Sequence, residues 1–368
     1  ADGELVVKAT PHIGYLHRCF EKVAENMTWP QVVPYVDRLD YLAPLANNVA
    51  YALAVEELLG GDRQLPPRCQ YIRVMGCELA RISSHLLGVG CFAMDVGAMT
   101  VFLHTFTERE KIHNLCESLT GARFTTSYTR VGGLLYDVND EWVGKVRTFI
   151  KGFAKTHNDI HKLLTRNRIF MERTKEVGVL SREEAINLSC TGPVARASGV
   201  VRDVRKDDPY LAYGDFDFRV ICAQAGDCYA RYLVRMEEMQ ESIKIIEQAV
   251  ENIPAGPLNV DAEGKAVLPG KTEVYRSIEG LIHHFELVMP NRGFPAPTDE
   301  LYAATESPNG ELGFYLVADG TDHAYRARTR PPSYIHFAVF PYLIVGHQIS
   351  DIVAVLGSLN IIAAELDR

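Results

Sequence analysis

The feature that most constrains the fold is a set of long segments in which apolar residues recur at steps of three and four. In residues 71–87, for example, Ile72, Met75 and Leu79 follow this spacing, which places them on one face of an α-helix. Further helices are predicted over 46–59, 105–119, 141–164, 227–253 and 271–288. Because such apolar faces must pack against one another, we predict a mainly α protein with a helical core over about residues 46–289.

Strand patterns are predicted only near the two ends of the chain. Residues 4–10 read as a strand that begins so abruptly that its partner could precede it. Further β elements are expected over about 311–339, with a hairpin turn at 319–322. A last short helix is predicted over about 350–358. We expect small sheet elements added to one helical domain that spans residues 1–368.

Composition narrows the class of protein. The 368 residues include 38 Lys+Arg and 47 Asp+Glu, so 38 − 47 gives a net charge of −9. This balance argues against non-specific nucleic-acid binding, which needs cations to neutralise phosphates. The best candidate membrane span, 331–350, contains three prolines and two histidines. The start of the chain lacks the regions of a signal peptide, and the eight cysteines are too sparse for a disulfide scaffold, so we expect a reducing compartment.

The usual metal, cluster and nucleotide motifs are missing from the sequence. His157 and His161 are spaced i, i+4, but no glutamate follows His157 and their polar neighbours favour a surface helix. Cys222 and Cys228 lie six apart with no second pair, so we expect incidental thiols. The glycines at 88–90 lack the strand–helix context of a phosphate loop. We expect this chain to hold no metal or cofactor by itself.

A polar run before the first long helix is more informative. Asp37, Arg38, Asp40 and Tyr41 place four polar groups within five residues. Local helix capping would account for the two aspartates. Arg38 and Tyr41 could be an ordinary surface arginine and a half-buried tyrosine. Alternatively, the tyrosine hydroxyl could bond a ligand carbonyl while its ring lines an apolar slot.

Asp95 is a lone acid among the apolar residues of segment 91–100. A buried carboxylate needs a partner or a raised pKa, and either would suit a proton relay. The alternative is a turn aspartate before Gly97.

Two charged stretches, 202–208 and 325–330, are typical of solvated faces. They could instead dock neighbouring subunits. In the second stretch, arginines at 326, 328 and 330 would lie on one face of a strand.

Eight runs, in order and over nearly the whole chain, resemble the 49-kDa (D-type) subunit of respiratory complex I. They lie at residues 11–18, 37–41, 51–56, 95–100, 226–229, 311–313, 351–355 and 367–368. The resemblance implies the fold of the [NiFe]-hydrogenase large subunit with its metal site lost. Where such a hydrogenase would have D-P-C-x-x-C, residues 358–364 contain no cysteine, so a nickel enzyme is disfavoured.

The resemblance also implies an activity and a site. The chain would be a subunit of a proton-translocating NADH:quinone oxidoreductase that forms the quinone cavity beside the subunit holding the terminal [4Fe–4S] cluster. Tyr41 matches the family tyrosine that bonds the quinone headgroup, and Asp95 matches the acid that partners a headgroup histidine. Arg18 and Arg38 match arginines near the terminal cluster. NADH and FMN would bind elsewhere in the complex.

The implied partners are the terminal-cluster subunit, a 30-kDa-type subunit, a ferredoxin-like two-cluster subunit, the membrane subunit at the quinone entrance and quinone itself. The implied location is peripheral, on the cytoplasmic side of the bacterial inner membrane or the matrix side of the mitochondrial one. The alternatives are the same subunit in a ferredoxin- or deazaflavin-linked quinone reductase, and a non-catalytic assembly scaffold.

Three departures from the family pattern bear on the site. The family run G-P-x-H-P-x-x-H-G, which holds the headgroup histidine, does not occur in this sequence. Thr125 stands where many members have a histidine near the terminal cluster, and Cys19 stands where glycine is common. Since a hydroxyl does not titrate near neutral pH, we expect weak proton coupling at that cluster.

Overall fold

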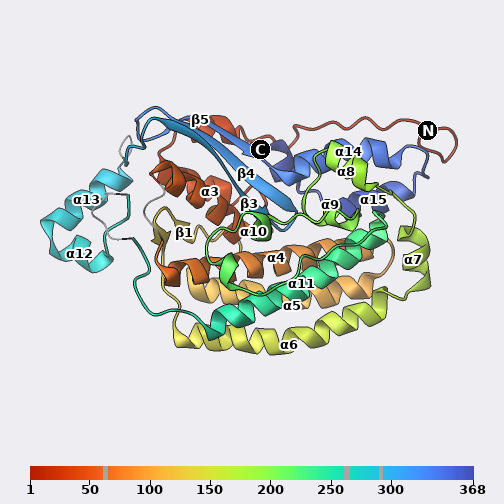
Figure 1. Cartoon of the computed structure of the whole chain (residues 1–368), viewed down its shortest axis with the longest axis horizontal. Helices are drawn as coiled ribbons and strands as arrows, with labels where there is room; N and C mark the ends of the chain where they lie inside the picture. The colour runs from red at the N-terminus through yellow and green to blue at the C-terminus, as the bar shows by residue number, and fades with distance from the viewer. Residues whose placement is uncertain (61–64, 261–265, 290–292) are drawn as a thin grey trace.

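Four long helices form the body of the molecule. The computed structural model describes residues 1–60, 65–260, 266–289 and 293–368. Helices α4 (Pro67–Asp95), α5 (Met99–Thr120), α6 (Asp140–Leu164) and α11 (Cys228–Glu251) run side by side along the long axis (Figure 1). The predicted helical core and the mainly α class are therefore confirmed.

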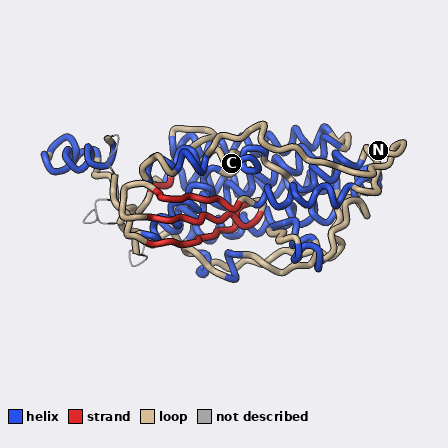
Figure 2. Tube along the Cα trace, turned by 90° about the horizontal axis from the view of Figure 1, so that it is seen from above, coloured by secondary structure: helices blue, strands red, loops and turns tan. Residues whose placement is uncertain are grey.

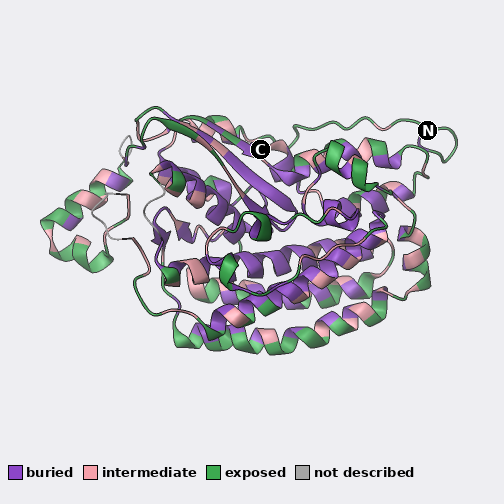
Figure 3. Cartoon of the chain, viewed as in Figure 1, coloured by how far each residue is buried: buried purple, intermediate pink, exposed green. Residues whose placement is uncertain are grey.

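Helix α4 lies at the centre of this body. It is longer than the predicted 71–87 and contacts α3 (Pro44–Leu58), α5, α11 and α15 (Asp351–Leu359). Figure 3 shows α4 buried along most of its length, whereas α6 exposes its outer face. A helix covered on every side loses the polar stripe that marks its boundaries in a sequence, so periodicity alone detected only its middle.

A three-stranded antiparallel sheet packs on α3. Its strands are β3 (Asp299–Ser307), β4 (Gly310–Ala318) and β5 (Ala324–Arg330), in the order β3-β4-β5. Figure 2 shows them side by side along one flank of the helical body. Strands β4 and β5 confirm the predicted hairpin. Strand β3 was missed because its alanines and acids have low strand propensity.

The predicted strand at 4–10 is wrong. This segment makes only isolated bridges, although the Val6 N–H donates to the His347 carbonyl at 2.9 Å and the Ile349 N–H donates to the Glu4 carbonyl at 2.8 Å. Its partner therefore lies near the other end of the sequence. The pairing is too short to form a ladder, so the segment is extended chain held at a few points.

Two further predictions need correction. The β elements do not extend to residue 339, because β5 ends at Arg330 and α14 (Pro332–Ile344) follows. Helix α14 has a proline at its first position, where the missing N–H costs no hydrogen bond. The segment 271–288 is two helices, α12 (Lys271–Arg276) and α13 (Ile278–Val288). Ser277 separates them because its extended backbone ends the first, while its hydroxyl caps the second.

The remaining elements are short. The predicted helix at 350–358 is confirmed as α15. The elements not yet named are α1 (Phe20–Ala24), α2 (Trp29–Val36), β1 (Thr129–Arg130), β2 (Gly133–Leu134), α7 (Arg168–Thr174), α8 (Arg182–Asn187), α9 (Gly192–Ala197), α10 (Val204–Asp207), η1 (Tyr213–Asp215) and α16 (Ala363–Asp367). Within the described ranges, no helix is both long and apolar enough to cross a bilayer.

Candidate functional site

The polar run at 37–41 forms the connection between α2 and α3. Asp37 is the C-cap residue of α2, and Pro44 starts α3. Leu39 and Asp40 are buried, whereas Arg38 is exposed and Tyr41 is half-buried. The buried residues anchor the turn, so the arginine and the tyrosine are left at the surface of the body.

Asp37 ties this connection to the loop after α5. Its Oδ2 accepts hydrogen bonds from the Ser127 N–H at 2.9 Å and from the Ser127 hydroxyl at 2.5 Å. Burial raises the pKa of Asp37, although the bonds from Ser127 oppose that rise. The Asp37 side chain therefore does not cap the following helix, as the capping interpretation expected. Its carboxylate instead binds a loop that is distant in sequence. Through that bond, the structure brings half-buried Thr125 to the 37–41 run.

Tyr41 packs against the same loop. The centroid of its ring lies 6.1 Å from that of Phe124, and the two planes are inclined by 38°. Burial raises the pKa of the Tyr41 phenol, and the negative charge of Asp40 raises it further. The phenol therefore stays protonated at physiological pH and can donate a hydrogen bond from an aromatic surface.

Arg18 lies next to Arg38, which belongs to the same turn as Tyr41. An Arg18 Nη2 donates to the Arg38 carbonyl at 2.8 Å, and the Arg38 guanidinium donates to the Pro34 carbonyl. Burial lowers the pKa of Arg18, and the charge of Arg38 lowers it further. Two neighbouring cations make the local potential positive, which favours a negatively charged group nearby.

Of the two alternatives for Asp95, the buried carboxylate is wrong. It is the last residue of α4 and is exposed, although partial burial still raises its pKa. It lies one turn after Cys91, whose pKa is raised by burial and then by the charge of Asp95. The turn interpretation fits its position before Gly97, which has a φ of 96°.

Arg109 on α5 is a residue of this site that sequence reasoning missed. Its side chain is largely buried, with Nε donating to the Ser83 hydroxyl at 3.2 Å and the guanidinium 5.9 Å from the centre of the Phe124 ring. Burial lowers the pKa of Arg109, while the neighbouring Cys91, Asp40 and Tyr41 side chains oppose this. In the sequence it stands between two glutamates and resembles any solvated helix face. Only the packing of α5 on α4 brings Arg109 next to Phe124, the ring against which Tyr41 packs.

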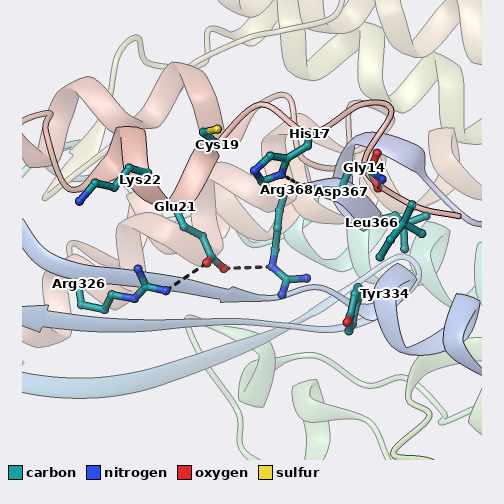
Figure 4. Close-up of a pocket in the computed structure, with 11 residues that line it drawn as sticks. Gly14, His17, Cys19, Glu21, Lys22, Arg326, Tyr334, Leu366, Asp367 and Arg368 are labelled. Carbon is teal, nitrogen blue, oxygen red and sulfur yellow. Dashed lines mark hydrogen bonds and ion pairs between the residues drawn. The ribbon is translucent and has the colours of Figure 1, made fainter.

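A surface cavity of about 350 Å³ lies between His17, Cys19 and the C-terminal residues (Figure 4). Glu21 forms ion pairs there with Arg368 at 3.0 Å and with Arg326 at 3.5 Å. The Asp367 carboxylate accepts hydrogen bonds from two backbone N–H groups of the segment that leads to Arg18. The C-terminal residues therefore hold the Arg18 segment in place.

The chain's similarity to known proteins agrees with the resemblance found in its sequence. Residues 95–368 match the family model described as "Respiratory-chain NADH dehydrogenase, 49 Kd subunit". The D-type NADH-quinone oxidoreductase subunit of Methylacidiphilum infernorum is 53% identical over 367 residues, covering 100% of this chain and 87% of the relative. The chain belongs to the 49-kDa subunit family of the respiratory-chain NADH dehydrogenase. The D-type subunits of Opitutus terrae (52% identical, 85% of its length covered) and Akkermansia muciniphila (49%, 87%) match all of this chain as well.

Cys19, directly after Arg18, has an unusual backbone conformation for a residue with a side chain. Its backbone φ is 55°, in the left-handed region that favours glycine. The cysteine therefore carries backbone strain directly after Arg18.

The two charged stretches, 202–208 and 325–330, are solvated only in part. In the first, Asp203 and Arg205 are buried and ion-paired at 2.6 Å. In the second, Arg326 pairs with Glu25 at 2.7 Å and Arg330 donates to the Glu311 carbonyl at 2.6 Å. The solvated-face interpretation is therefore wrong for Asp203 and Arg205, which are buried, whereas the other charged residues of 202–208 are exposed, as are Arg326 and Arg328.

The two histidines at i, i+4, His157 and His161, form hydrogen bonds within the chain. His157 is buried, not on a solvated surface, and its Nε2 lies 3.0 Å from the Met236 carbonyl. His161 lies on the next turn, with its Nδ1 2.7 Å from the Thr165 hydroxyl. Within the described ranges, no group of three or more His, Cys, Asp or Glu side chains could hold a metal ion.

Proposed function

We propose that this chain is the quinone-side subunit of a proton-translocating NADH:quinone oxidoreductase, and that Tyr41 binds the quinone headgroup. The observation that carries the proposal is the half-buried, protonated phenol of Tyr41 packed on Phe124, with the Arg109 cation acting on it. The relatives are named NADH-quinone oxidoreductase subunits. A ring-lined donor beside a cation suits an aromatic ligand that gains negative charge on reduction.

The residues of this chain would supply positioning and electrostatics, since the electrons come from outside it. Reduction of a quinone to a quinol takes two electrons and two protons. The Tyr41 hydroxyl would donate to a quinone oxygen as negative charge develops there, and Arg109 would stabilise that charge from behind. Asp95, exposed at the end of α4, would partner a histidine of the headgroup site.

Arg18 and Arg38 would face the neighbouring subunit that carries the terminal [4Fe–4S] cluster. Their adjacent positive charges would favour the reduced state of that cluster, which is the more negative one. The other proposed partners are the 30-kDa-type subunit, the ferredoxin-like two-cluster subunit and the membrane subunit at the quinone entrance. NADH and FMN would bind elsewhere in the complex, and no cofactor would be bound by this chain alone.

The proposed fold relationship is to the [NiFe]-hydrogenase large subunit without its metal. The proposed location is on the membrane surface, on the cytoplasmic side in bacteria or the matrix side in mitochondria. A peripheral position fits a subunit whose described helices are too short or too polar to cross a bilayer.

Photolabelling of the assembled complex tests the quinone site. An azido-quinone should label peptides that contain Tyr41 and Phe124, and excess quinone should abolish the labelling. The peptide carrying Tyr275, an exposed tyrosine on α12, is the control for non-specific reaction. Labelling confined to other peptides, or insensitive to competing quinone, would refute the site.

Thr125 gives a second test, through the neighbouring cluster. Because a threonine hydroxyl does not titrate, the midpoint potential of the terminal cluster should change little between pH 6 and 8. Thr125→His should introduce a pH dependence that approaches about 59 mV per pH unit for one electron. Redox titration followed by electron paramagnetic resonance would measure it, with Thr107→His on the exposed face of α5 as the control. A steep dependence in the unmodified complex would contradict the role assigned to Thr125.

A further inference from the structure

The loop after α5, residues 121–128, is tied down on both sides of Phe124. On one side, the Arg123 guanidinium donates hydrogen bonds to side chains of α5. On the other side, the Ser127 N–H and hydroxyl both donate to Asp37 Oδ2, at 2.9 and 2.5 Å. The Phe124 ring, which packs on Tyr41, lies between these two ties.

Only the tie to Asp37 joins this loop to the turn that carries Tyr41. Within the described ranges, the two bonds from Ser127 are the only hydrogen bonds between residues 121–128 and the 37–41 run. The Asp37 side chain is completely buried, so water does not compete for these bonds, and its negative charge strengthens them. The position of Phe124 relative to Tyr41 therefore depends on Asp37.

The backbone of Ser127 shows that this tie holds the loop against strain. Its φ is 42°, in the left-handed region that residues with a side chain rarely adopt. Such a conformation persists where the surrounding contacts enforce it. Without the acceptor on Asp37, the Ser127 backbone could relax and the loop could move away from the turn.

We propose that Asp37 is a positioning residue for quinone reduction, which holds the loop through Ser127 and so keeps the Phe124 ring and the Tyr41 phenol in their working arrangement. The inference rests on the proposed function of Tyr41 and adds what holds that donor in place. Because Asp37 is completely buried, it acts through Tyr41 and not by contact with the quinone. A shift of about 1 Å in a reacting group is enough to lower a rate severely.

The charge of Asp37 has to be separated from its role as an acceptor. A guanidinium nitrogen of Arg38, Nη1, lies 3.9 Å from Asp37 Oδ2, so the carboxylate also faces a cation. Asp37→Ala removes both the charge and the acceptor. Asp37→Asn removes the charge alone, because its amide oxygen can still accept the two bonds from Ser127.

These two variants in the assembled complex test the inference. Asp37→Ala should lower kcat for quinone reduction at least about tenfold, with a smaller change in KM for quinone. Asp37→Asn should restore most of that rate. Asp319→Ala is the matched control and should behave as wild type, because Asp319 Oδ1 accepts the same pair of bonds, from the Thr321 N–H at 3.2 Å and hydroxyl at 2.6 Å, in an exposed turn.

Combination with Tyr41→Phe shows whether Asp37 acts through the phenol. Once the hydroxyl is absent, Asp37→Ala should lower kcat by less than about twofold further, since residues that act through one another are not additive. A merely structural role of Asp37 would instead lower kcat by the same factor in both backgrounds, and that result would overturn the inference.

The outcomes separate this inference from the proposed function. If Asp37→Ala keeps a normal kcat while Tyr41→Phe is impaired, the positioning role is refuted and the role of Tyr41 stands. If Tyr41→Phe is also normal, the proposed function itself fails. An Asp37→Asn complex as impaired as Asp37→Ala would assign the effect to the charge and refute positioning through the acceptor.

A variant on the loop decides the matter if Asp37→Ala does not assemble. Ser127→Ala removes the hydroxyl bond and keeps the one from the N–H. A loss of kcat of at least about threefold that disappears beside Tyr41→Phe supports the inference, and a normal kcat overturns it.

Discussion

Replacing Tyr41 by Phe is expected to lower the rate of quinone reduction by about 10²–10³-fold while the complex remains assembled. The substitution removes only the hydroxyl, which is the group proposed to donate to the quinone oxygen as charge develops. The ring is retained, so its contact with Phe124 at 6.1 Å should persist and the loop after α5 should stay in place. The loss should therefore fall on kcat, with a small change in KM for quinone.

Tyr35→Phe is the matched control for this prediction. Tyr35 lies on α2, six residues earlier, and its side chain is exposed. The same chemical change there should leave the steady-state rate of NADH:quinone reduction unaltered. An assembled Tyr41→Phe complex with normal activity would favour the alternative in which this polar run only orders the assembly.

The helices were predictable because their signal is local. In α6, for instance, Trp142, Val146 and Phe149 form a stripe that needs no knowledge of what covers it. The errors lie where the deciding contact is distant in sequence. The segment 4–10 bonds to residues 346–349. The start of β4 is held against α9 by the Thr191 hydroxyl, which accepts from the Glu311 N–H.

The site was predictable only in part, for the same reason. The run 37–41 was detected because four polar groups before an apolar helix are unusual in any fold. Its surroundings were not detected, since Phe124 and Arg109 reach Tyr41 through the packing of α5. For Asp95 the sequence was misleading in the other direction. Its neighbours in sequence are apolar, but the residue lies at the end of α4 and is exposed.

In the charged run at 202–208, Asp203 and Arg205 were misjudged, because sequence reveals charges but not their partners. A chain of buried ion pairs crosses the molecule from α10 to α4 and α11. Arg205 binds Asp203 at 2.6 Å and Glu78 at 3.1 Å, and Arg196 binds Glu238 at 2.8 Å and Glu306 at 2.7 Å. These side chains are almost completely buried, so each charged group is stabilised mainly by its oppositely charged partners and not by water.

Arg196→Met should therefore be one of the most damaging single changes, with a loss of about 3–5 kcal/mol in the free energy of unfolding. Methionine fills similar space but leaves Glu238 and Glu306 as buried carboxylates without their cation. Urea-induced unfolding of the purified chain would measure the loss. Arg202→Met is the control, because Arg202 is mostly exposed and its pair with Glu311 at 3.0 Å should contribute at most about 1 kcal/mol.

The pH dependence of this loss identifies its cause. Burial alone would raise the pKa of Glu238, but the charge of Arg196 and the hydrogen bond from His85 outweigh burial and lower it to about 2. A depressed carboxylate pKa stabilises the fold above the unfolded value of about 4.5, and this contribution disappears as the pH falls from there toward 2. The deficit of Arg196→Met relative to wild type should be complete above about pH 4.5 and shrink below it. A deficit that is equal at pH 7 and pH 3 would point instead to lost packing of the arginine stem, because burial of the stem does not depend on protonation.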